Sequence, residues 1–202
     1  ALSSLIYAIS ERKGFVLLTG EIGAGKTTIC RALLNRLDPN TKVAVITNTR
    51  LTGKQLLQAI CEEFNLWIPG NVGKVTLFSE LNSFLVDQYR MGQNVVLIID
   101  EAQNLQPKVL EQIRLLTNLE TTKHKLLQIF LVGQPELRTL LQREGLRQLN
   151  QRITARYHLR PFSARETADY VRHRLAVAGV ERRLFTRGAL RHIHRLSAGI
   201  PR

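Results

Sequence analysis

The sequence predicts an α/β fold in which helices cover both faces of a parallel sheet. Short apolar runs alternate with helix-length amphipathic segments as far as residue 160, which is the pattern of repeated strand–helix–strand units. The run Val95–Ile99 contains only valine, leucine and isoleucine, as expected for a central strand buried on both faces. Beyond Pro161 the pattern indicates helices alone, so we expect a domain boundary close to this residue.

The first half of the chain carries two expected strands and three expected helices. Residues 15–19 form an apolar run that ends in a glycine-rich turn, and residues 43–47 form a second run. Helical patterns are found at residues 26–37, 52–64 and 75–89, the second of them opened by Thr52. Pro69 and two glycines indicate a loop over residues 65–74.

The second half continues the alternation and then changes to helices. After the strand at residues 95–99, we expect a helix at 107–119, a strand at 126–132, a helix at 135–149 and a strand at 156–159. Ser163 and Glu166 form a capping box that predicts a helix over residues 163–178, which Gly179 ends. A second helix is expected over residues 186–197.

The composition is that of a globular protein, which excludes the disordered and fibrous classes, since 44% of the residues are hydrophobic and 22% are charged. The longest apolar runs have five residues, whereas a membrane-spanning helix needs about 20, so we expect no span in this chain. Residues 1–10 lack a basic region and the sequence does not begin with Met, so we expect no signal peptide either. Cys30 and Cys61 have neither disulfide-framework nor metal-site spacing, so we expect reduced, partly buried thiols.

Positive charge is concentrated in the last third of the chain. The formal net charge is +13, and residues 138–202 contain 15 arginines, no lysine and 4 acidic residues. Such an asymmetry suggests an anionic partner, which could be nucleotide phosphates, an acidic subunit face, nucleic acid or a membrane surface. The alternative is a solvated face that parts of the protein outside this sequence neutralise.

Residues 20–27 fit the phosphate-loop pattern G-x-x-x-x-G-K-[ST] at every fixed position, between an expected strand and an expected helix. The glycines let backbone N–H groups turn inward around phosphates, and the helix start adds positive potential. We expect Lys26 to reach the β- and γ-phosphates and Thr27 to bind Mg²⁺. The expected nucleotide contacts are Gly20, Glu21, Ile22, Gly23, Ala24, Gly25, Lys26, Thr27 and Thr28.

Two acidic residues, Asp100 and Glu101, directly follow the expected central strand. Ligands bind at the carboxyl ends of strands in such sheets, so both carboxylates are well placed. Asp100 is expected to hold Mg²⁺, directly or through water. Glu101 is not needed for metal binding and suits a general base that activates water for attack on the γ-phosphate. The pair therefore favours hydrolysis of ATP over transfer of the phosphoryl group to a small molecule.

With these motifs, the chain resembles an AAA+ ATPase, a P-loop NTPase with a parallel sheet sandwiched by helices. More narrowly, it is similar to the ATPase domain of ExeA/GspA-type general secretion pathway proteins, and it shares much of its pattern with TniB/TnsC-type transposition ATPases. The resemblance extends over the whole chain and rests on residues 11–21, 100–105, 132–137, 151–157 and 199–202. It implies a nucleotide-binding domain at residues 1–161 and a truncated small helical lid domain at 162–202.

The resemblance also implies roles for residues that spacing alone does not assign. Gln134 occupies the position of a polar sensor of the γ-phosphate, with an ordinary turn residue as the alternative. Arg152 stands where a neighbouring subunit's arginine finger is expected, and Arg156, on the same face if this segment is helical, is its competitor. Arg202 matches a lid arginine that touches the phosphates. By analogy Leu5, Ile6 and Ile9 line an adenine pocket, although core packing explains their spacing equally well.

Taken together, these features predict Mg²⁺-dependent ATP binding and hydrolysis by a homo-oligomer, a ring or a dimer. The resemblance implies a cytoplasmic domain, at the inner membrane in the full-length protein, that energises or regulates a bacterial secretion or pilus system through a partner protein. The alternative is a DNA-binding ATPase that regulates transposition. The arginine-rich segment favours this alternative, but the sequence shows no helix-turn-helix signature, zinc spacing or aromatic–basic platform.

Overall fold

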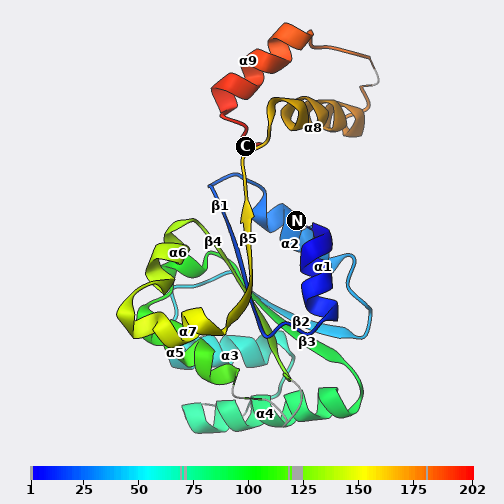
Figure 1. Ribbon diagram of the computed structural model, residues 1–202. Coiled ribbons are helices and arrows are strands. Elements are labelled where there is room, and N and C mark those ends of the chain that lie inside the picture. Colours follow the sequence, from blue (N-terminus) through cyan, green and yellow to red (C-terminus); the bar gives the residue numbers. More distant parts are fainter. Residues whose placement is uncertain (1, 69, 71, 118, 120–124, 181) are drawn as a thin grey trace.

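The computed structural model describes residues 2–68, 70, 72–117, 119, 125–180 and 182–202. Pro69 and Asn71 of the expected loop and Asn118 of the expected helix at 107–119 therefore lie outside the described residues. Its strands form one sheet in the order β2–β3–β4–β1–β5 (Figure 1). They are β1 (Phe15–Gly20), β2 (Thr41–Ile46), β3 (Asn94–Ile99), β4 (Gln128–Gly133) and β5 (Ile153–Leu159). All neighbours pair in parallel, so the strands' carboxyl ends lie along one edge. The predicted parallel α/β sheet is confirmed.

Helices cover both faces of this sheet (Figure 1). One face packs against α1 (Leu2–Ser10) and α2 (Lys26–Leu34). The other packs against α3 (Gly53–Glu63), α4 (Lys74–Arg90), α5 (Pro107–Leu116), α6 (Glu136–Leu141) and α7 (Arg147–Arg152). Two short 3₁₀ turns, η1 (Ala102–Asn104) and η2 (Glu144–Leu146), connect these elements.

Alternation of side chains along the strands builds the two cores. Phe15 and Leu17 of β1 point into the core under α3 and α5, whereas Val16 and Leu18 point into the core under α1 and α2. Strands β3 and β4 divide their residues in the same way. Because both faces are buried, each central strand is apolar at nearly every position, which explains the continuous runs in the sequence.

The single helix expected at residues 135–149 is wrong. The chain forms α6, leaves the helix at Arg143, which has extended backbone angles, and then forms η2 and α7. Leu137, Leu141, Leu146 and Leu149 are all buried. In one straight helix at 100° per residue, Leu146 would face opposite to Leu137, so the break is what turns all four leucines toward the core.

Two further boundaries differ from the expectation. Helix α1 is not among the expected elements, and its Leu5 and Ile9 are buried in the core under the sheet. Strand β5 begins at Ile153, three residues before the expected start, so Arg156 lies on a strand and does not share a helical face with Arg152. The other expected helices and strands are present with ends shifted by at most three residues.

Residues 162–202 form a C-terminal helical segment that stands beyond the carboxyl edge of the sheet (Figure 1). It contains α8 (Ala164–Val177), which starts with the predicted capping box, and α9 (Arg187–Ser197). The Phe162 N–H donates to the Gly199 carbonyl over 2.8 Å, which joins the end of the chain to the start of the segment. Among the described residues, no helix is long and apolar enough to cross a membrane.

Candidate active site

The phosphate loop connects β1 to α2 and encloses the Lys26 ammonium. Lys26 is buried, and its Nζ donates to the carbonyl oxygens of Gly20 at 2.8 Å and Glu21 at 3.1 Å. Gly23 and Gly25 have φ values of 82° and 92°, which L-residues rarely adopt. The loop therefore places a fixed cation beside the N-terminus of α2, where anionic phosphates are stabilised.

Thr27 and Asp100 meet across the carboxyl edge of the sheet. The Thr27 hydroxyl donates to Asp100 Oδ2 over 3.0 Å, while Asp100 Oδ1 accepts the Glu101 backbone N–H at 2.9 Å. These residues follow strands β1 and β3, which are separated by β4, so the contact depends on the sheet order. Hydroxyl and carboxylate oxygens are the ligands that Mg²⁺ prefers.

Glu101 lies at the centre of a polar cluster on the same edge. Its Oε2 accepts the side-chain amide of Gln103 and, over 3.2 Å, that of Gln134. The hydrogen bond from Gln103 lowers the pKa of Glu101; burial opposes this effect, while Gln134 and the Lys26 charge add to it. The lowered pKa favours the carboxylate form of Glu101. The Glu101 backbone has φ 50°, a value that is uncommon for residues other than glycine.

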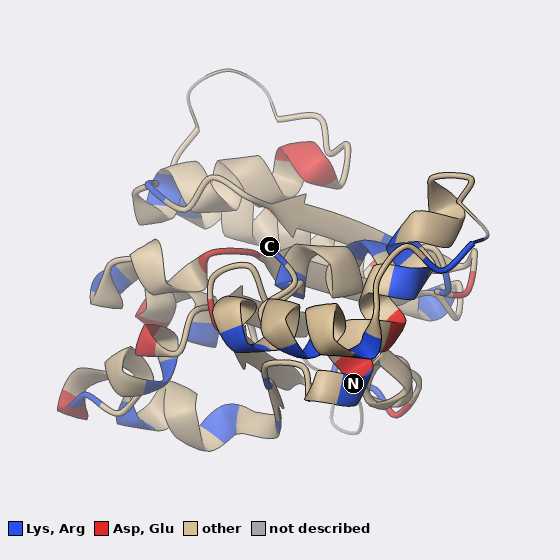
Figure 2. Ribbon diagram, turned by 90° about the horizontal axis from the view of Figure 1, so that it is seen from above, with Lys and Arg blue, Asp and Glu red and all other residues tan. Residues whose placement is uncertain are grey.

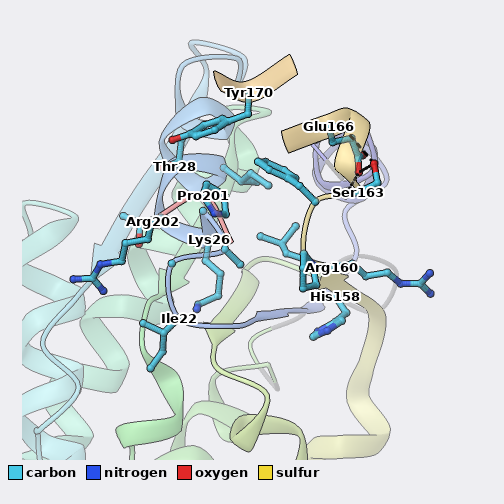
Figure 3. Close-up of a pocket in the computed structure, with 18 of the residues that line it drawn as sticks. Ile22, Lys26, Thr28, His158, Arg160, Ser163, Glu166, Tyr170, Pro201 and Arg202 are labelled. Atoms are coloured by element: carbon cyan, nitrogen blue, oxygen red, sulfur yellow. Dashed lines mark hydrogen bonds between the residues drawn. The ribbon is translucent and has the colours of Figure 1, made fainter. Parts of the chain in front are cut away.

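A cleft of about 1350 Å³ opens between the phosphate loop and the C-terminal helical segment (Figure 3). Its floor contains residues 22–29, Glu101 and Gln134, and its opposite wall includes Phe162, Tyr170 and His194. This volume is above the roughly 300–1,000 Å³ of typical small-molecule pockets, so the cleft has room for a small-molecule ligand. Seven of the nine residues expected on the phosphate loop and the start of α2 line this cleft, whereas Gly20, at the end of β1, and Glu21 do not.

Arg202 also lines the cleft, and its backbone end lies against the phosphate loop. A Cβ built on Gly23 would meet Arg202 Cβ at 2.6 Å, so the loop and the chain end are in contact. The Arg202 guanidinium, however, points away from Lys26 (Figure 3). In this conformation the side chain contributes no positive charge beside the lysine.

The two candidate finger arginines have different environments. Arg152, at the end of α7, is half-buried and donates to the hydroxyl of the buried Thr117. Arg156, on β5, is exposed and donates to the Asn150 carbonyl at 2.6 Å and side-chain oxygen at 2.8 Å. Neither arginine lines the cleft of its own chain.

Several residues in or next to the cleft were not among the expected site residues. Gln103 joins Glu101 to Gln134, and the buried Thr49 donates to the Glu101 carbonyl over 3.2 Å. Both are polar residues a short distance after an apolar strand, which is the signal that identified Asp100 and Glu101. Phe162, Tyr170 and His194 carry no comparable signal. Leu5 and Ile9 are buried in the core, Ile6 is half-buried against it, and none of the three lines the cleft, as the packing alternative expected.

The remaining sequence expectations concern the thiols and the charge. Cys30 and Cys61 are free and buried, as predicted. Burial, with the charge of Asp100, raises the pKa of Cys30 to about 12. Seen from the side of α8 and α9, basic residues outnumber acidic ones (Figure 2), and the arginines of the C-terminal helical segment are exposed.

Comparisons with known proteins agree with this geometry. The family profile described as "AAA domain" matches residues 9–141. "General secretion pathway protein A" of Aeromonas hydrophila is 52% identical over all 202 residues, which span 37% of that protein's length.

Solved structures show the same fold. Drosophila ORC bound to DNA gives a TM-score of 0.70 at 19% identity, covering 100% of this chain and 50% of that one. Cdc6p from Pyrobaculum aerophilum gives 0.68 at 18% identity, covering 95% and 52%. A RuvB mutant from Thermotoga maritima gives 0.60 at 21% identity, covering 100% and 57%. The family match and the sheet with its phosphate loop show that this chain belongs to the AAA domain family of P-loop NTPases.

Proposed function

We propose that this chain binds ATP with Mg²⁺ and hydrolyses it at the carboxyl edge of the sheet. The observation that carries the proposal is the convergence of Lys26, Thr27, Asp100 and Glu101 beside one cleft, with Thr27 and Asp100 in direct contact at 3.0 Å. A cation, two oxygen ligands for Mg²⁺ and a further carboxylate that activates water are the groups that suit phosphoanhydride hydrolysis.

Each of these residues has a separate role in the proposed reaction. Lys26 binds the β- and γ-phosphates, and the loop glycines present backbone N–H groups to them. Glu101 accepts a proton from water while the water oxygen attacks the γ-phosphorus. The bond between that phosphorus and the β–γ bridging oxygen breaks, which leaves ADP and inorganic phosphate. Gln134 lies beside Glu101 at the same edge of the sheet, where its side-chain amide would also donate to a γ-phosphate oxygen.

The donor set fits Mg²⁺ held with help from the nucleotide. Within the described ranges, no group of three or more histidine, cysteine, aspartate or glutamate residues forms a dedicated metal cage. Mg²⁺ is usually bound by one or two protein oxygens, with phosphates and waters completing its shell, and Thr27 with Asp100 supplies this minimum. The ion would neutralise charge that develops on the phosphate oxygens.

A second copy of the chain would complete the site. Arg152 and Arg156 lie outside the cleft of their own chain, so either would reach a nucleotide only across an interface. We assign the trans role to Arg152, with Arg156 as the competitor; Arg152 would first have to leave Thr117. Arg202 would turn toward the phosphates when nucleotide is present.

The proposed biological role follows from the relative. Identity of 52% along the whole chain to a general secretion pathway protein supports a cytoplasmic ATPase domain that energises or regulates a secretion or pilus assembly at the inner membrane. We keep a second candidate, a DNA-binding ATPase of the transposition type, because the exposed arginines of residues 162–202 suit phosphate contacts. A steep salt dependence of DNA binding would favour this second role.

The enzymatic proposal is tested with two substitutions. Lys26→Ala should abolish most ATP binding in calorimetry, whereas the exposed Lys42→Ala should bind as the wild type does. Glu101→Gln should bind Mg²⁺–ATP normally and hydrolyse it at least about 10²-fold more slowly. Unchanged affinity in Lys26→Ala, or unchanged hydrolysis in Glu101→Gln, would contradict the assignment.

A further inference from the structure

Gln103 occupies a position between the two polar groups that follow β3 and β4. It lies in η1, in which Ala102 is buried and after which Leu105 is buried. The turn is closed by the Asn104 N–H, which donates to the Glu101 carbonyl, and the Leu105 N–H, which donates to the Ala102 carbonyl. The backbone of Gln103 is therefore fixed on both sides. Its side chain is half-buried and turns toward Glu101 and Gln134.

Both ends of the Gln103 amide are used. Its Nε2 donates to Glu101 Oε2, and its Oε1 accepts the Gln134 backbone N–H at 3.1 Å. The partners determine the orientation of the amide, since a backbone N–H only donates and a carboxylate only accepts. An amide is thus the group that satisfies both neighbours at once.

The neighbouring backbone leaves little room for Gln103 to move. A Cβ built on Gly133 would lie 2.6 Å from Gln103 Oε1, so the glycine makes the space that the amide occupies. The Gln134 side chain adds a second donor to Glu101 Oε2. Within the part of the chain that the structure describes, Oε1 of Glu101 has no hydrogen-bond partner.

We propose that Gln103 is a positioning residue that holds Oε2 of Glu101, so that Oε1 is the oxygen presented to the attacking water. This inference rests on the proposed ATPase function. The amide also connects Glu101 to the backbone of Gln134. The distance between the general base, Glu101, and the residue proposed to contact the γ-phosphate, Gln134, is thereby fixed. A displacement of about 1 Å of such a group lowers a rate by about 10²-fold.

Two substitutions separate positioning from a structural role. Gln103→Glu keeps an oxygen for the Gln134 N–H but replaces the donor to Glu101 with a like charge, so kcat for ATP should fall by about 10- to 10²-fold with KM within about twofold. Gln103→Leu removes both hydrogen bonds and should lose at least as much kcat. Gln106→Glu, an exposed glutamine three residues on, is the matched control and should keep the wild-type kcat.

A double variant tests whether Gln103 acts through Glu101. Adding Gln103→Glu to Glu101→Gln should cost no further activity, because the group that Gln103 positions is already lost. Wild-type kcat in Gln103→Glu would overturn the inference and leave the ATPase proposal standing. Parallel losses of ATP affinity and thermal stability in both Gln103 variants would show a structural role and overturn it too. Absence of hydrolysis by the wild type would overturn both proposals.

Discussion

The sheet part of the chain, up to Pro161, and the C-terminal helical segment are stabilised in different ways. Every fully buried hydrophobic side chain among the described residues belongs to the sheet part. In the segment, Thr167 and Gly199 are the only described residues that are buried, and its helices rely on the caps at Ser163 and Thr186. Segments with few buried apolar contacts open at low free-energy cost, so the segment is the part expected to move.

The two parts of the chain also contribute different groups to the cleft. The sheet part supplies Lys26 from the first turn of α2 and Asp100 and Glu101 from the end of β3, and such elements hold side chains more precisely than loops do. The segment supplies a wall of the cleft and carries nine arginines against three acidic residues. Under the proposed function, a rigid edge beneath a weakly packed wall would let the cleft close on nucleotide without disturbing the core.

The largest expected contrast is in stability. Leu97→Ala empties a fully buried position in β3 and should lower the free energy of unfolding by about 2–5 kcal/mol. Leu196→Ala changes an exposed leucine of α9 and should alter it by less than about 0.5 kcal/mol. Urea denaturation measures both. Equal losses would show that the segment shares the core's cooperative unit.

The next effect tests whether the sheet part is complete in one copy. Arg152→Ala and Glu101→Gln should each lose about 10²-fold or more in kcat with little change in ATP affinity, because both groups act in the transition state. Mixing the two variants should restore activity, since some interfaces then combine an intact arginine with an intact glutamate. No recovery in a sample shown to co-assemble would move the role to Arg156 or to a group of the same chain.

A smaller effect is expected where the two parts join. Gly199 has φ 76°, and a Cβ there would lie 2.2 Å from the Phe162 carbonyl oxygen, so Gly199→Ala should displace the segment. We expect KM for ATP to rise about 10-fold, equivalent to 1.4 kcal/mol, with the urea midpoint nearly unchanged. In the control Gly188→Ala, the new Cβ approaches only Thr186 Oγ1, at 3.8 Å. An unchanged KM for ATP in Gly199→Ala would show that the segment does not contribute to nucleotide binding.

The smallest effect concerns the thiols, which occur only in the sheet part. Burial raises the pKa of Cys30 to about 12 and that of Cys61 to about 11, so the folded state favours the protonated thiols. Their stabilising contribution is complete below the ordinary thiol pKa near 9 and is lost as pH rises toward 11–12. The double variant Cys30→Ala, Cys61→Ala should therefore lose less stability than the wild type between pH 8 and pH 10.5. If the free energy of unfolding fell equally with pH in the wild type and the double variant, this prediction would be wrong.

Local patterns anticipated much of this molecule. The run Val95–Ile99, the phosphate-loop spacing and the Ser163–Glu166 capping box each depend on neighbours in sequence, and each lies where it was expected. The expected helix at 135–149 failed because leucines five residues apart, at 141 and 146, must reach the same core, which helical spacing alone does not permit.

By itself, the sequence determined the alternating elements, the loop with Lys26 and Thr27, and the acidic pair after the central strand, since spacing, propensity and turn chemistry are local. The tertiary structure decided which of these groups meet. Thr27 and Asp100 come into contact because β1 and β3 lie on either side of β4. Gln103 bridges Glu101 and Gln134 because η1 and the end of β4 pack together. The contacts of Thr27 with Asp100 and of Gln103 with Gln134 join residues far apart in the chain, so they depend on sheet order and packing, which no local pattern encodes.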